Sequence, residues 1–90
     1  MVHSNGALRI YLQTSPTAEG SPRFCQLFLQ PDLLGGWTLI RESGTQGSSS
    51  RLRREHHETI DEAEEALMRE RDRLTTRGYQ VVFVQGIERP

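Results

Sequence analysis

Hydrophobic and polar residues alternate in several short segments of the chain. In the segment ALRIYLQ, Leu8, Ile10 and Leu12 fall on one face, which is the period-two pattern of a strand with one buried side. Further strands are predicted over residues 23–30, 37–43, 51–58 and 79–84. The segment RLRREHHE (51–58) has Leu52 as its only aliphatic residue, so we expect it at an exposed edge of the sheet. The run VVFV, residues 81–84, is wholly apolar, so we expect the last strand to be buried through these side chains.

The period becomes helical after Ile60. Asp61 and Glu64 have the spacing of an N-cap and its reciprocal acid, and Gly78 suits the residue that follows a helix. Acidic residues crowd the first turns of this helix and arginines the last, which matches the helix dipole. The apolar residues between these ends fall on one stripe, which should face the sheet. The expected core is Ile60, Ala63, Leu67 and Leu74, with Leu8 or Ile10, Leu27, Leu39 and Val82.

The order of four strands, one helix and a last strand predicts an α+β fold, an antiparallel sheet of four to five strands crossed by one α-helix. A chain of 90 residues buries only about two-thirds of its unfolded surface, so we expect a single domain over residues 1–90. Residues 1–6, MVHSNG, are polar and are expected to be frayed.

Charge and cysteine content restrict the function. All eleven basic residues are arginines, twelve residues are acidic, and the net charge is −1, which argues against the global positive field of a strong nucleic-acid binder. Any such binding must come from a local patch. The single cysteine, Cys25, lies in a predicted strand, where a small buried side chain is favoured and a reducing compartment fits. No apolar run approaches the ~20 residues of a membrane helix, so we expect a cytoplasmic protein.

The sequence offers little for catalysis or metal binding. His56 and His57 are adjacent on a predicted strand and would point to opposite faces, so we expect no metal site and no cofactor. No base can be assigned to a serine or to Cys25, and without lysine a P-loop is excluded. A glycine-containing turn, the hydroxyls of Ser48 to Ser50 and the guanidiniums of Arg51, Arg53 and Arg54 can meet an anion together. A flexible hairpin with solvated arginines is at least as good an interpretation.

The stretch RFCQLFLQPDLLGGWTLIRESGTQG, followed by TIDEAEEALMRERDRLTTRGY, resembles a WGR domain, the small module of poly(ADP-ribose) polymerases and of short bacterial proteins. The resemblance runs from Arg23 to Tyr79 and implies a sheet crossed by one helix. Trp37 matches the family's strand tryptophan, which belongs to the fold. At the family's Trp-Gly-Arg signature this chain has Ser43, Gly44 and Thr45, so the DNA-contacting roles of that tryptophan and arginine cannot be carried over.

The resemblance and the arginines together imply a non-enzymatic, WGR-like binding module with weak affinity for nucleic acid. The candidate binding residues are Arg41, Gly44, Thr45, Gly47, Arg51, Arg53 and Arg54. The alternative is a protein–protein interaction module that has lost DNA binding and docks another chain, or itself, through the sheet or an edge strand. The substitutions at Ser43 and Thr45 favour the alternative, and the arginine cluster favours nucleic acid. We expect no membrane and no small-molecule substrate.

Overall fold

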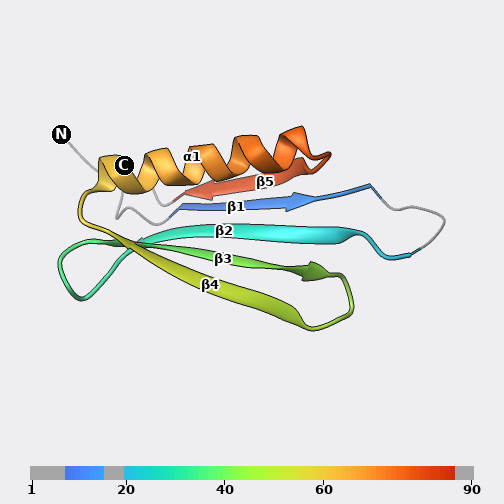
Figure 1. The fold of residues 1–90 in the computed structure, drawn as a ribbon, viewed down its shortest axis with the longest axis horizontal. Helices are drawn as coiled ribbons and strands as arrows, with labels where there is room; N and C mark the ends of the chain where they lie inside the picture. Colours follow the sequence, from blue (N-terminus) through green and yellow to red (C-terminus); the bar gives the residue numbers. More distant parts are fainter. Residues whose placement is uncertain (1–7, 16–19, 87–90) are drawn as a thin grey trace.

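The computed structural model describes residues 8–15 and 20–86. These residues form a five-stranded sheet and one α-helix, and the helix lies along one face of the sheet (Figure 1). In chain order the elements are β1 (Leu8–Gln13), β2 (Arg23–Pro31), β3 (Trp37–Thr45), β4 (Ser50–His57), α1 (Ile60–Thr76) and β5 (Gln80–Gly86). The expected α+β class is confirmed. The expectation about residues 1–6 lies outside the described residues.

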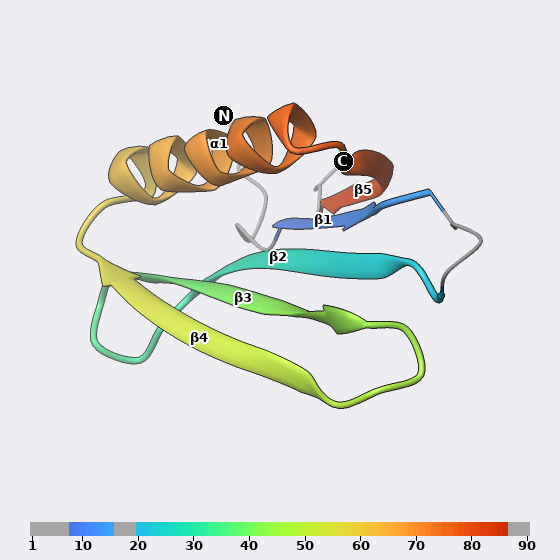
Figure 2. The same ribbon diagram turned by 45° about the vertical axis from the view of Figure 1, so that its right-hand side comes forward.

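The strands lie in the order β4-β3-β2-β1-β5, and every neighbouring pair is antiparallel. The first four strands form a meander in which each pairs with the next. After α1 the chain returns to place β5 beside β1, so the first and last strands are neighbours (Figures 1 and 2). β4 forms the opposite edge of the sheet, as its charged sequence predicts.

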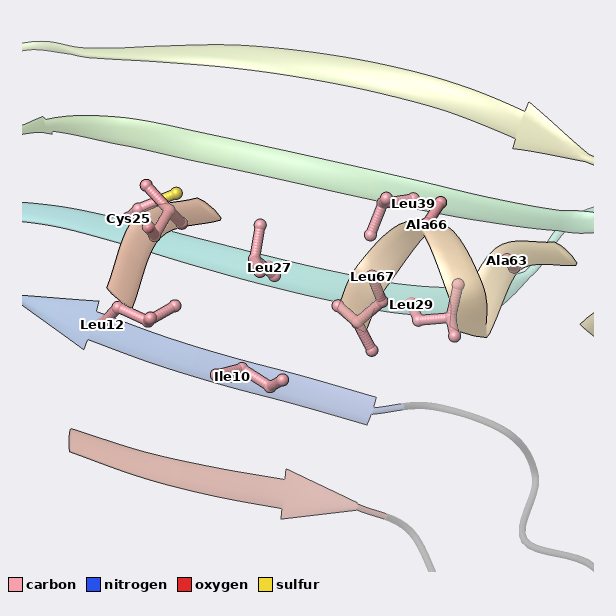
Figure 3. Close-up of a cluster of buried hydrophobic side chains, with 10 residues drawn as sticks. Ile10, Leu12, Cys25, Leu27, Leu29, Leu39, Ala63, Ala66 and Leu67 are labelled. Carbon is pink, nitrogen blue, oxygen red and sulfur yellow. The ribbon is translucent and has the colours of Figure 1, made fainter. Parts of the chain in front are cut away.

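The core lies between α1 and the middle of the sheet. Figure 3 shows side chains from β1, β2, β3 and α1 gathered there, and none of the labelled residues comes from the outer strands. From α1, Ala63, Leu67 and Leu74 are buried and Ile60 packs partly buried against them, which confirms the predicted helical stripe. The strands contribute Ile10, Leu12, Cys25, Leu27, Leu29 and Leu39.

The expected burial of the last strand is wrong. Val82 is 55% exposed, and Val81, Phe83 and Val84 are exposed as well. The physical reason is the sheet order: β5 is an edge strand, and no residue of it belongs to the core cluster beneath α1. Four consecutive apolar residues are typical of a buried strand. Here they lie on an edge strand outside the core, which ends at the side chains of β1.

The N-cap of the helix lies two residues before the predicted one, Asp61. Thr59 is the N-cap, with an extended backbone, and its hydroxyl oxygen accepts a hydrogen bond from the Glu62 amide at 3.1 Å. Asp61 instead lies in the first turn of the helix, where its negative charge interacts favourably with the positive end of the helix dipole. The other end agrees with the sequence: Gly78 has a φ of 102°, and the amide of Tyr79 donates to the Leu74 carbonyl at 3.0 Å.

The turn between β2 and β3 is organised by Asp32. Its Oδ1 accepts the amides of Leu34 and Gly36, at 2.9 and 3.0 Å, and its Oδ2 lies 2.7 Å from His56 Nδ1 on β4. Partial desolvation works to raise the pKa of Asp32, but these hydrogen bonds, led by that from Gly36, outweigh it and lower the pKa. One carboxylate thereby ties the turn to the edge strand.

Gly36→Ala should destabilise the protein by about 1 to 3 kcal/mol, because an added Cβ would overpack the site. That atom would lie 2.5 Å from the His57 carbonyl oxygen and 2.6 Å from His56 Cε1. Urea unfolding followed by circular dichroism measures the loss. Gly20→Ala is the control, since its Cβ would meet no atom within 4 Å, and equal stability of the two variants would contradict the prediction.

The face of the sheet away from α1, called the open face below, carries a row of aromatic rings. Tyr11 stacks between Phe24 and Phe83, with ring centroids 5.9 and 5.7 Å apart and interplanar angles of 1° and 9°. The guanidinium of Arg9 lies 5.5 Å from the Phe83 centroid and 5.7 Å from that of Phe28. The rings and the guanidinium therefore pack against one another across β2, β1 and β5 on this face.

Candidate anion-binding groove

A groove lined by arginines runs between α1 and the strands β3 and β4. It consists of two adjoining hollows of about 430 and 210 Å³, which share Arg41, Arg53, Glu70 and Arg73 as lining residues. We call the two hollows together the arginine groove. Its basic lining is Arg41, Arg51, Arg53, Arg54, Arg69, Arg73 and Arg77, against the two acids Glu55 and Glu70. A strong local excess of positive charge therefore exists in a protein of net charge −1.

Local structure explains how the strands contribute. Side chains alternate along β3, so Arg41 and Ser43 point to the same side of the sheet as the buried Leu39. The antiparallel register then places Arg53 opposite Arg41 and Arg51 opposite Ser43. The strand periodicity thus brings three guanidiniums to the helix side of the sheet.

The helix supplies the other wall. Arg69, Arg73 and Arg77 are spaced four residues apart, so they follow one stripe along the C-terminal half of α1 and the residues after it. In the sequence these arginines match the helix dipole, and their spacing suggests exposure and ion pairing, but nothing there connects them with the strands. The four-residue spacing was the signal that could have placed them on one face.

Glu70 lies at the centre of the groove and binds two of its arginines. Its carboxylate pairs with Arg41 Nη1 and accepts from Arg73 Nε at 3.2 Å, and its side chain is only 14% exposed. Desolvation works to raise the pKa of Glu70, but the hydrogen bonds and charges of Arg73 and Arg41 outweigh it and hold the pKa below the ordinary 4.5. The same carboxylate raises the pKa of Arg73.

The arginines nearest to Glu70 are therefore partly neutralised, and the others are not. Arg51, Arg53, Arg69 and Arg77 form no ion pair with any residue that the structure describes. Their guanidiniums keep all their donors for solvent or for an incoming anion. Planar forks of this kind bind phosphate or carboxylate oxygens in pairs.

The residues predicted from sequence divide between three places. Arg41, Arg51 and Arg53 come together in the arginine groove. Gly44 and Thr45 line a separate hollow with Arg51, Arg23 and Tyr79, and Gly47 lies in the turn between β3 and β4 with a φ of 87°. Arg54 borders the groove from β4, although its register partner Ile40 belongs to the open face.

Cys25 borders the groove but is not a reactive thiol. It is 1% exposed, and burial together with the charge of Glu70 raises its pKa to about 11. The neutral thiol is a poor nucleophile, because the thiolate is the reactive form. Over residues 8–15 and 20–86 no group of three or more His, Cys, Asp or Glu side chains is placed to hold a metal ion.

Within the same described part of the chain, no helix has both the length and the apolar character needed to cross a membrane. In comparisons with known proteins, no family model, no curated protein and no solved structure matches this chain.

Proposed function

We propose that this protein is a non-enzymatic, WGR-like module of the cytoplasm that binds the phosphate backbone of nucleic acid weakly through the arginine groove. The observation that carries the proposal is the convergence of arginines from β3, β4 and α1 on one open groove. Phosphate contacts of this kind give affinity without reading the sequence of bases.

The distribution of the acidic residues supports the choice of this surface. Asp61, Glu62, Glu64 and Glu65 are exposed at the N-terminal half of α1, whereas the arginines gather along its C-terminal half. The molecule is therefore polarised although its net charge is close to zero. A polyanion should approach with its backbone along the arginine groove and away from the start of the helix.

The groove also argues for a modest affinity. Glu70 repels phosphate and already pairs with Arg41 and Arg73. The four arginines without an ion pair among the described residues, Arg51, Arg53, Arg69 and Arg77, remain to release counterions, which predicts a slope of roughly −4 for log K against log salt on duplex DNA. The tryptophan of the WGR signature is absent at Ser43, and a stacking contact worth about 1 to 3 kcal/mol is lost with it. We therefore expect no strong preference among bases.

Fluorescence anisotropy with labelled duplex, single-stranded and blunt-ended DNA over a series of salt concentrations tests the proposal. The double variant Arg53→Gln/Arg69→Gln should bind more weakly than the wild type. Its plot of log K against log salt should also be shallower, with a slope smaller in magnitude by about 2. Neither arginine has an ion-pair partner among the described residues, so the fold should be kept.

The matched control is Arg9→Gln/Arg71→Gln, which makes the same change of net charge at two arginines that do not line the arginine groove. We expect this control to bind nearly as the wild type does. Equal losses in the two variants would show that the groove is not the site. A wild-type protein that binds no DNA even at low salt would refute the function itself.

A further inference from the structure

The two edges of the sheet differ in chemistry. β4 carries Arg51, Arg53, Arg54 and Glu55, and charged side chains on an edge strand oppose pairing with another chain. β5 (Gln80–Gly86) has no charged residue, and among the described residues it pairs with β1 alone. All its residues are exposed, and Val84 reaches 59%. Within residues 8–15 and 20–86, the outer backbone groups of β5 have no strand partner, and apolar side chains flank them on both faces of the sheet.

We propose that β5 pairs antiparallel with β5 of a second copy of this chain, which joins two five-stranded sheets into one continuous sheet across a twofold axis. The proposal does not depend on nucleic-acid binding. It rests on three features of the strand: its lack of charge, its self-complementary order of residues, and the aromatic row that ends on it.

The register of β5 on β1 makes the strand self-complementary. Tyr11 pairs with Phe83 and Leu12 pairs with Val81, so Val82 is an extra residue that forms a β-bulge. Without the bulged residue, β5 reads Gln80, Val81, Phe83, Val84, Gln85, and this order is symmetric about Phe83. Antiparallel pairing centred on Phe83 therefore places valine opposite valine and glutamine opposite glutamine.

The faces of the strand agree with the same pairing. Val81 is opposite the buried Leu12 and Val84 opposite the buried Ile10, so both valines lie on the side of the sheet that carries α1. Gln80 and Gln85 are opposite Gln13 and Arg9, on the open face. A twofold axis perpendicular to the sheet keeps these faces, so each pair of opposed side chains lies on one side. No charge is brought against another.

The aromatic row supplies the contact at the axis. Phe24, Tyr11 and Phe83 are stacked in sequence across three strands, and the row ends at Phe83, which is 42% exposed. The second copy brings its own Phe83 to this end, so that two rows of three rings continue into one another. Phe83 is thus the exposed end of the row at the edge of the sheet, where a ring from a second copy can pack against it.

The interface is expected to be weak and reversible. Only one short strand from each copy takes part, and the bulge at Val82 interrupts regular pairing. Light scattering coupled to size exclusion should therefore give the mass of 10.3 kDa at low micromolar concentration and approach twice that value toward millimolar concentration. A protein that stays monomeric throughout this range would refute the proposal.

Substitutions on the two edges locate the interface. Val84→Lys places a charge opposite Val81 of the other copy and should give a monomer. Leu52→Lys on the exposed face of β4 is the control and should leave the dimer intact, since Leu52 is 48% exposed at the other edge. A dimer that survives Val84→Lys, or one that Leu52→Lys removes, would place the interface elsewhere and overturn the proposal.

A charge pair tests the register. In the proposed register Val81 of one copy is opposite Val84 of the other. A chain with both Val81→Glu and Val84→Lys therefore forms two Glu–Lys pairs across the axis, and this double variant should dimerise although each single variant does not. Failure of this rescue in a variant with native circular dichroism would contradict the register.

A cross-link tests whether the twofold axis lies at position 83, without adding a charge to the edge. Phe83→Cys should form an intermolecular disulfide on mild oxidation, because directly opposed strand residues have Cα atoms about 4.5 to 5.5 Å apart, within disulfide range. The native Cys25 is buried and does not compete. Leu52→Cys should not cross-link, and the reverse result would refute the assignment.

Discussion

Leu67→Ala is expected to lower the free energy of unfolding by about 2 to 5 kcal/mol, which is a large part of the stability of a domain this small. Leu67 is fully buried at the middle of α1 and packs into the core formed by β1, β2 and β3 (Figure 3). Its truncation leaves a cavity, since the strands beneath it are held by the sheet and cannot move in to fill the space.

Equilibrium unfolding in urea, followed by circular dichroism, measures the effect. Met68→Ala is the matched control, because it removes a similar volume from the next residue of the same helix, whose side chain is 38% exposed. We expect the control to lose less than about 1 kcal/mol. Similar losses at the two positions would mean that α1 does not pack through Leu67.

Glu70→Gln is expected to have two opposite effects. It removes the carboxylate that Arg41 and Arg73 share, and loss of these charge-assisted hydrogen bonds should destabilise the fold by about 1 to 3 kcal/mol. The same change removes the central negative charge from the arginine groove. One unit charge at 4 Å is worth about 1 kcal/mol even in water, so DNA affinity should rise about fivefold.

The stability effect should depend on pH in a defined direction. The pKa of Glu70 is lowered in the folded protein, so its charge stabilises the fold above the ordinary pKa of 4.5. This contribution is lost as the pH falls through the lowered pKa. The difference in unfolding free energy between the wild type and Glu70→Gln should therefore be full at neutral pH and shrink below about pH 4.5.

Glu64→Gln is the control for both effects, because Glu64 is exposed on α1 and does not line the arginine groove. It makes the same change of net charge, so a general electrostatic effect would appear equally in both variants. If Glu70→Gln bound DNA no better than Glu64→Gln, the proposed groove would not be where the phosphates lie.

The parts of the fold that were predictable are those set by local periodicity. The alternation of apolar and polar residues in β1 predicts one buried face of the strand, and the apolar stripe through Leu67 predicts one buried face of α1. The structure confirms both. The exposure of β5 was not predictable in this way, because Val81 to Val84 look the same in the middle of a sheet and at its edge. The position of β5 in the sheet depends on which strand it pairs with after α1. No local sequence pattern specifies that pairing.

The candidate site shows the same division. Arg51 and Arg53 are two residues apart in sequence and could be grouped with the glycine turn beside them. Arg69 and Arg73 join them only because α1 crosses the sheet beside β3 and β4, which is a consequence of packing. The sequence therefore predicts the arginines that the strands contribute to the arginine groove, but not those that α1 contributes.

The pairing of β1 with β5 also has a consequence for how the chain folds. The hairpins from β1 to β4 close short loops, whereas Leu8 and Gly86, which pair with each other, lie at opposite ends of the described chain. Closing so long a loop carries a larger entropic cost and slows folding, so the docking of β5 should follow the meander. Until it docks, β1 is itself an open edge, and during synthesis β1 stays unpaired on that side until the last strand has left the ribosome.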